Sequence, residues 1–249
     1  MKILISPAKN MNTSHDFLKP KSLPFFLAKT KEIVEVLKNK SYDDYFAIFN
    51  ASQNIINKTY QTYQNFSFTE NLTPAILAYD GIQYKYMLNT LFTSQEYEYL
   101  NENLYILSGL YGVLRPFDGI SDYRLEMVNN LAINENKDLY QYWHDLIYQY
   151  IFKDNEVVLS LLSNEYKKCL LPYLKNNDQF IEVYFYEKEG NKLKDKAVYT
   201  KMARGLMVRY IVQNKIKSLE EVKKFQENGY EYNEELSNNY KLVFIRTKI

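Results

Sequence analysis

The chain has few of the residues that cross-link a fold or bind metal. Its 249 residues include one cysteine, Cys169, and two histidines. A single cysteine excludes an intrachain disulfide and a cysteine-based zinc centre, and it is typical of a reducing compartment, so we expect a cytoplasmic protein. No cysteine or histidine cluster has the spacing of a metal site, and we predict neither a metal nor a cofactor.

Several common functional motifs are also missing. The sequence has no Walker loop, no Rossmann glycine fingerprint and no G-x-S-x-G elbow. No run approaches eighteen apolar residues, so we expect no membrane partner. A net charge of +1 gives the molecule no overall attraction for polyanions. Any nucleic-acid site must therefore be a local patch.

Arginine and glycine are scarce, and their positions are informative. The chain has five arginines against 26 lysines, and seven glycines. Residues 107–127, LSGLYGVLRPFDGISDYRLEM, contain three of those glycines together with Arg115 and Arg124. An arginine in a chain that otherwise uses lysine indicates a need for the planar guanidinium group and its several N–H donors. This group serves phosphate contacts and structural carboxylate pairs alike.

Strand and helix patterns alternate along the chain. Short apolar runs predict strands at 2–7, 75–81, 103–109, 156–162 and 240–246, and an alternating pattern predicts a β-hairpin over 180–200. Helical spacing occurs at 25–40, 43–58, 82–91, 94–101, 137–153 and 203–217. The late hairpin favours a mixed α/β (α+β) fold, with helices flanking a partly antiparallel central sheet. Without linker-like segments, we predict a single domain, 1–249.

The first strand is followed by a polar segment, SPAKN, at residues 6–10. Ligands of open α/β sheets bind at the carboxyl ends of the strands. If the sheet is parallel there, Lys9 shares one rim with the loops at 80–84 and 109–116.

Residues Gly109–Gly112, GLYG, follow a predicted strand. Such a turn can direct backbone N–H groups at an anion, or it can be a tight turn that needs a positive φ.

A second basic block, KMARGLMVRYI, covers residues 201–211 and contains Lys201, Arg204 and Arg209. From 192 to 224 there are ten Lys or Arg residues against three Asp or Glu. This excess indicates either a phosphate-contacting surface or an ordinary solvated face.

Eight motifs together resemble the YaaA family of bacterial peroxide-stress proteins: ILISPAKN, AYDGIQY, LSGLYGVLRPFD, YRLEM, DLYQYW, SNEY, KMARGLMVRYI and FQENGYEYNEELS. The resemblance runs from residue 1 to the final strand. It implies a cytoplasmic protein induced by hydrogen peroxide that limits free iron and Fenton damage to DNA. It also implies an unusual α/β topology, a basic DNA-binding cleft and a helix-hairpin-helix element.

On this resemblance, GLYG is the turn of the helix-hairpin-helix, although two residues separate its glycines where the usual signature has one. The resemblance implies binding to duplex or branched DNA through its phosphates, largely without reading sequence, and we expect the protein to be a monomer. The expected DNA-binding residues are Lys9, Gly109, Leu110, Tyr111, Gly112, Arg115, Arg124, Lys201, Arg204 and Arg209.

Two other functions remain open at this point. The same cleft could serve an enzyme acting on a nucleotide or nucleic acid, with Asp80, Asp118, Asp122 or Glu126 as general acid or base. Direct iron sequestration would require carboxylate ligands, for which the sequence shows no recognisable spacing. We assign no catalytic residue.

Overall fold

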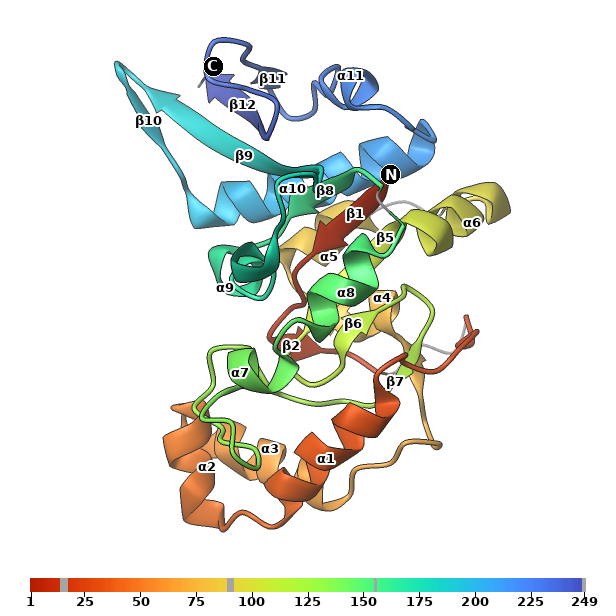
Figure 1. The fold of residues 1–249 in the computed structure, drawn as a ribbon, viewed down its shortest axis with the longest axis vertical. Helices are drawn as coiled ribbons and strands as arrows, with labels where there is room; N and C mark the ends of the chain where they lie inside the picture. The colour runs from red at the N-terminus through yellow and green to blue at the C-terminus, as the bar shows by residue number, and fades with distance from the viewer. Residues whose placement is uncertain (14–17, 89–91, 155, 248–249) are drawn as a thin grey trace.

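The computed structural model describes residues 1–13, 18–88, 92–154 and 156–247 (Figure 1). Its main sheet has the strand order β11-β12-β9-β8-β1-β5-β6, with β10 paired to β9. The strands are β1 (Lys2–Ile5), β5 (Leu104–Ser108), β6 (Gly112–Leu114), β8 (Val158–Leu161), β9 (Phe180–Glu189), β10 (Lys192–Lys194), β11 (Tyr230–Tyr232) and β12 (Lys241–Thr247). The five strands from β12 to β5 are parallel, and β6, β10 and β11 are antiparallel. The predicted mixed α/β class is confirmed.

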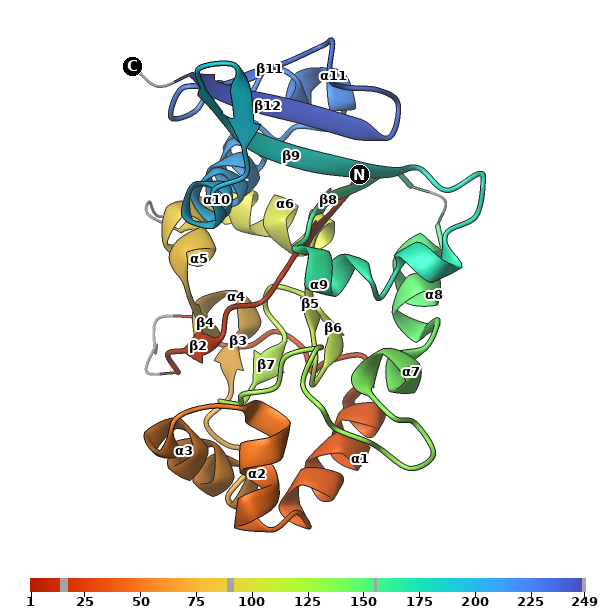
Figure 2. The same ribbon diagram turned by 90° about the vertical axis from the view of Figure 1, so that its left-hand side faces the viewer.

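Helices flank this sheet on both sides (Figure 2). One side has α5 (Ile82–Met87), α6 (Ser94–Asn103) and α10 (Ala197–Gln213), and the other has α8 (Leu146–Phe152) and α9 (Asn164–Lys167). One continuous apolar core extends from Ile3 to Phe244.

The opposite end of the molecule contains α1 (Leu27–Lys38), α2 (Tyr42–Phe49) and α3 (Gln53–Gln64). Two small strand pairs connect this end to the sheet: β2 (Asn10–Met11) with β4 (Tyr79–Asp80), and β3 (Thr73–Pro74) with β7 (Gly119–Ile120). The remaining elements are α4 (Ala75–Ala78), α7 (Leu139–Trp143), the 3-10 helix η1 (Leu171–Tyr173) and α11 (Leu219–Val222).

Three predicted elements differ from the structure. The apolar run 75–81 forms the helical turn α4 and the two-residue β4, because a segment buried on every side has no face pattern to mark its period. The predicted helices 43–58 and 137–153 are each interrupted by one residue with a positive φ. That residue is Asn50 in the first and His144 in the second, both with φ 43°. Residues 89–91 of the predicted helix 82–91 lie outside the described ranges.

The expected helix-hairpin-helix at Gly109–Gly112 is wrong for these residues, which form the turn of the antiparallel β5–β6 hairpin. Ser108 Oγ accepts hydrogen bonds from the backbone N–H groups of Leu110 (3.2 Å) and Tyr111 (3.0 Å). Both residues are buried, with exposed fractions of 0% and 2%. Gly112 has φ +70°, and a Cβ there would lie 2.8 Å from the Trp143 ring. The turn is therefore packed into the core and offers no phosphate-binding surface.

Candidate functional site

The strands β1 and β8 are parallel neighbours, and their chain connections leave in opposite directions across the sheet. β1 leads toward β5 on one side, whereas β8 leads toward β9 on the other. In open α/β sheets such a point opens a crevice at the carboxyl ends of the two strands. A cavity of about 410 Å³ lies there, lined by residues 6–10, 80–84, 123–126, 163, 165, 166, 201 and 204. We call it the strand-end pocket.

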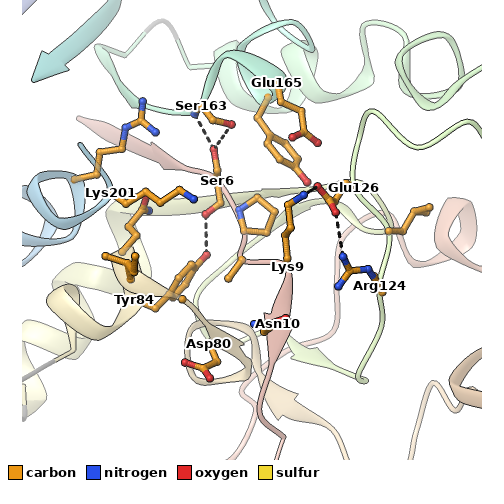
Figure 3. A pocket seen from close by; sticks show the side chains of 18 of the residues that line it. Ser6, Lys9, Asn10, Asp80, Tyr84, Arg124, Glu126, Ser163, Glu165 and Lys201 are labelled. Carbon is orange, nitrogen blue, oxygen red and sulfur yellow. Dashed lines mark hydrogen bonds and ion pairs between the residues drawn. The ribbon is translucent and has the colours of Figure 1, made fainter. Parts of the chain in front are cut away.

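Hydroxyl groups connect the segments that meet in the strand-end pocket (Figure 3). Ser6 Oγ accepts a hydrogen bond from the Ser163 backbone N–H at 2.9 Å and donates to Ser163 Oγ at 3.2 Å. The Tyr84 hydroxyl donates to the Ser6 carbonyl at 3.0 Å. These bonds fix the ends of β1 and β8 to α5, so the wall of the pocket is held by the strands themselves.

Two glycines permit the close packing that completes the pocket. A Cβ on Gly205 would lie 2.2 Å from the Gln83 carbonyl oxygen, so α10 rests directly on α5. A Cβ on Gly81 would lie 2.9 Å from Ala8 Cβ. The glycine after Arg204 therefore serves helix packing, and its effect is to bring the basic residues of α10 to the pocket.

A charged cluster forms one wall. Glu126 lies between two cations, with Lys9 Nζ at 2.6 Å from Oε2 and an Arg124 guanidinium nitrogen at 3.7 Å from Oε1 (Figure 3). The Lys9 side chain is 67% exposed, whereas those of Arg124 and Glu126 are largely buried. One carboxylate thus offsets part of the positive charge of both cations.

Glu165, on α9, adds a second carboxyl group to the pocket. Burial raises the pKa of Glu165, and the negative charge of Glu126 raises it further. The backbone N–H of Val128 donates to Glu165 Oε1 at 3.4 Å, which opposes the rise in pKa. A carboxyl group in this environment is suited to hold or transfer a proton.

Arg204 is the most desolvated cation of the pocket. Burial lowers the pKa of its guanidinium group, and Nε is buried without a hydrogen-bond partner among the described residues. Within the same ranges, no carboxylate lies in ion-pair distance of Arg204 or Lys201. Lys201 is exposed and extends toward Ser6 (Figure 3). The Asp195 carboxylate acts on Arg204 only from beyond ion-pair distance, and an anion in the pocket would offset more of the cost of burying this charge.

The structure brings four of the ten predicted DNA-binding residues together: Lys9, Arg124, Lys201 and Arg204. The loop 80–84 joins 6–10 at the rim as expected, but 109–116 does not line the pocket. Its place is taken by 123–126, which packs against Gly109: a Cβ there would lie 2.6 Å from the Leu125 carbonyl oxygen.

Arg115 lies at the other end of the strands. It follows β6, whose residue Leu114 pairs with Ile106, so Arg115 is near the amino end of β5. Its guanidinium group lies 5.1 Å from the Tyr105 ring centroid and donates to the Asn101 carbonyl. The hypothesis that Arg115 and Lys9 share a rim is therefore wrong, because Lys9 follows the carboxyl end of the parallel strand β1.

Two further arginines make ion pairs away from the pocket. Arg209 contacts Glu227 at 3.1 Å. Arg246 contacts the fully buried Glu187 through two nitrogens, with distances of 2.8 Å to Oε2. These positions use the arginine fork for carboxylates, the structural alternative left open by the sequence.

Comparison with known proteins bears on the whole chain. The family model described as "Peroxide stress protein YaaA" matches residues 1–236. The chain belongs to this family. A UPF0246 protein of Limosilactobacillus reuteri is 45% identical over 245 residues, covering 98% of each chain. Similar proteins of Agathobacter rectalis and Clostridioides difficile are 41% and 40% identical over 246 residues, covering 99% of this chain and 99% and 100% of theirs.

The carboxylates considered for this YaaA-family chain divide into two groups. Asp80 and Glu126 line the strand-end pocket. Asp118 instead accepts hydrogen bonds from the Arg115 backbone N–H (2.8 Å) and from the Ser22 hydroxyl (2.6 Å), and Asp122 pairs with a lysine at 3.1 Å. Only the first group is placed for chemistry in the pocket.

Sequence reasoning missed three polar groups of the pocket. Ser6 directly follows the buried strand β1 and Ser163 comes two residues after the end of the buried strand β8, so the strand-end rule was a usable signal for both. Glu165 lies in the first turn of α9, and nothing in its local sequence separates it from a surface glutamate.

A second cavity of about 350 Å³ adjoins the first and shares Lys9, Asn10, Tyr123 and Arg124 with it. It extends along α3, with further lining residues Met11, Asn54, Ile55, Lys58, Thr59, Thr62 and Asp122. We call it the side pocket. In the described part of the chain, no three His, Cys, Asp or Glu side chains group as metal ligands. None of the helices in those ranges has the length and apolar character to cross a bilayer.

Proposed function

We propose that this YaaA-family protein acts in the peroxide response by binding DNA at the strand-end pocket, largely without reading sequence. The observation that carries the proposal is the convergence of Lys9, Arg124, Lys201 and Arg204, from three distant segments, on one switch-point cavity. Cations that contact phosphates position a nucleic acid without discriminating among bases. The patch is local, which is consistent with the net charge of +1.

Lys201 and Arg204, on the α10 side of the pocket, support this proposal more strongly than the cluster of Lys9, Arg124 and Glu126. Glu126 already pairs with Lys9 and Arg124. For Lys201 and Arg204, by contrast, the described residues supply no carboxylate partner at ion-pair distance. Phosphate is therefore expected on the α10 side, where it would also satisfy the buried Arg204 Nε.

The test is a salt series of DNA affinity. Each phosphate contact contributes a slope of about −0.9 in log K against log salt, so Lys201→Gln and Arg204→Gln should each make the slope shallower by about one contact. Each should also weaken binding by about 1.5–3 kcal/mol, because a hydrogen bond to a charged group is lost. Lys217→Gln is the matched control, since Lys217 is exposed and lies outside the pocket. Unchanged DNA binding in both pocket variants would contradict the proposal.

We place the effect on iron downstream of DNA binding. Cells that carry Arg204→Gln should retain more free iron and more DNA damage after peroxide than cells with Lys217→Gln. Both quantities are measurable, by electron paramagnetic resonance of chelated iron and by counting strand breaks. Equal iron levels in the two strains would separate the iron effect from the pocket.

The alternative of an enzyme acting on a nucleotide or nucleic acid is favoured by one observation: Glu165, whose pKa is raised by burial and by the charge of Glu126, lines the same pocket as Lys201 and Arg204. An enzyme would convert DNA or nucleotides to new products, and Glu165→Gln would abolish that conversion while leaving binding intact. Product analysis after incubation decides between the two functions.

A further inference from the structure

The strand-end pocket and the side pocket are adjacent, and we call the two together the track. They share four residues, and their volumes are about 410 and 350 Å³. Sites for small molecules span about 300–1,000 Å³, so each cavity suits a ligand of that class. A duplex keeps its bases stacked inside two backbones, and therefore cannot place a base in such a cavity unless that base leaves the stack.

Cationic groups recur along this track. Lys201 and Arg204 lie at one end, in the strand-end pocket. Lys9 and Arg124 lie in the shared wall, and Lys58 lies at the far end, 3.1 Å from Asp122. Glu126 and Asp122 offset part of the charge of Lys9, Arg124 and Lys58, so a chain of phosphates would meet its strongest attraction at Lys201 and Arg204 and further cationic side chains along the track.

Apolar groups lie between the cations. Pro7, Ala8 and Ile82 are half-buried in the strand-end pocket, and Ile55 is 37% exposed in the side pocket. The faces of nucleobases are apolar, and their contact with such walls is tolerant of sequence. The alternation of cationic and apolar groups matches the alternation of phosphate and base in a single strand.

We propose that the track binds an unpaired DNA strand, with one nucleotide in the strand-end pocket, its phosphate against Lys201 and Arg204, and the next nucleotide in the side pocket. This inference rests on the proposed function and names the form of DNA that the site receives. The same chemistry is present in free nucleotides, so the experiment has to distinguish a strand end from a free nucleotide.

The experiment compares four probes with the full chain. Fluorescence anisotropy measures binding of a short blunt duplex and of the same duplex with an unpaired tail. Calorimetry measures binding of thymidine 5′-phosphate and of the dinucleotide pTpT. The tailed duplex should bind at least about tenfold more tightly than the blunt one, because only the tail presents unpaired bases to the apolar walls, and pTpT should bind more tightly than the mononucleotide.

Two variants locate the nucleotides. Arg204→Gln should weaken the binding of thymidine 5′-phosphate, of pTpT and of the tailed duplex. Lys58→Gln should weaken pTpT and the tailed duplex but leave the mononucleotide unchanged, because it removes a cation from the side pocket and leaves Asp122 without its partner. Lys217→Gln should leave all four probes unchanged.

Three outcomes would overturn the inference, and they are distinguishable. If blunt and tailed duplexes bind equally and pTpT does not bind, DNA binding stands and the unpaired-strand site is wrong. If pTpT binds and neither DNA does, the proposed function is wrong and the track belongs to free nucleotides. If Lys58→Gln weakens the binding of the mononucleotide as much as the binding of pTpT, the side pocket does not hold a second nucleotide.

Discussion

Gly205→Ala tests how the basic residues of α10 reach the pocket. In an ordinary helix the change from glycine to alanine is stabilising, by about 0.5–1 kcal/mol. Here the new Cβ would lie 2.2 Å from the Gln83 carbonyl oxygen and 3.0 Å from the Met87 backbone nitrogen. Both are backbone atoms of α5, so no side-chain rotation relieves the contact, and one helix has to move.

The expected loss of stability follows from these two opposing effects. Overpacking a well-packed site costs about 1–3 kcal/mol, and the rigid backbone contact places Gly205→Ala at the upper end of that range. After subtraction of the gain in helix propensity, the free energy of unfolding should fall by about 2 kcal/mol. For a chain of this size that lowers Tm by about 4–8 °C.

Circular dichroism during thermal unfolding gives the stability, and the salt series of DNA affinity gives the functional effect. Gly205→Ala should weaken DNA binding because it displaces Lys201 and Arg204 from the pocket. Gly190→Ala is the control: it has φ +58° with no atom within 4 Å of the added Cβ, so it should cost about 1 kcal/mol of stability without affecting DNA binding. A Tm for Gly205→Ala equal to or above that of the parent would refute the packing of α10 on α5.

Three other changes have defined outcomes. Arg246→Met should lower the free energy of unfolding in urea by about 3–5 kcal/mol, because it leaves Glu187, 1% exposed, as a buried charge without its cation; a loss below 1 kcal/mol would contradict the ion pair. Arg115→Gln should lower the free energy of unfolding by about 1–2 kcal/mol, because the contact of Arg115 with Tyr105 is lost, and it should leave DNA affinity unchanged. A drop in DNA affinity would mean that Arg115 contacts DNA after all. The raised pKa of Glu165 means that the folded state binds its proton more tightly than the unfolded state, so stability falls as pH rises from about the ordinary value of 4.5 through the folded-state pKa. Glu165→Gln should remove that part of the decline in a Tm–pH series, and parallel curves for the two proteins would contradict it.

The arginines show where sequence reasoning succeeds and where it stops. Scarcity marked all five as positions that need the planar guanidinium group, and the described contacts of Arg115 and Arg246 use it, for stacking on a ring and for a carboxylate held by two nitrogens. Scarcity did not tell which partner each arginine meets. Arg204 and Arg209 are five residues apart on α10, yet one lines the pocket and the other pairs with Glu227. The partner depends on which element packs beside that part of the helix.

The GLYG segment shows the same limit for glycine. Its residue types allowed either an anion-binding turn or a tight turn with positive φ, and local sequence favours neither. Trp143, more than thirty residues away, decides the matter, because its ring fills the space beside Gly112 and its Nε1 donates to the Gly109 carbonyl at 2.9 Å.

Local pattern was sufficient for the elements whose signals come from near neighbours. The strands within 2–7, 103–109, 156–162 and 240–246, the β9–β10 hairpin and the capping boxes at Thr93 and Ser218 all follow from alternation, apolar runs and side-chain hydrogen bonds over a few residues. The strand-end pocket has no such local signal. Its walls come from segments up to about two hundred residues apart, brought together by the parallel pairing of β1 with β8 and by the packing of α10 on α5. Long-range packing determined which of the basic residues face an open cavity and which are neutralised in the fold.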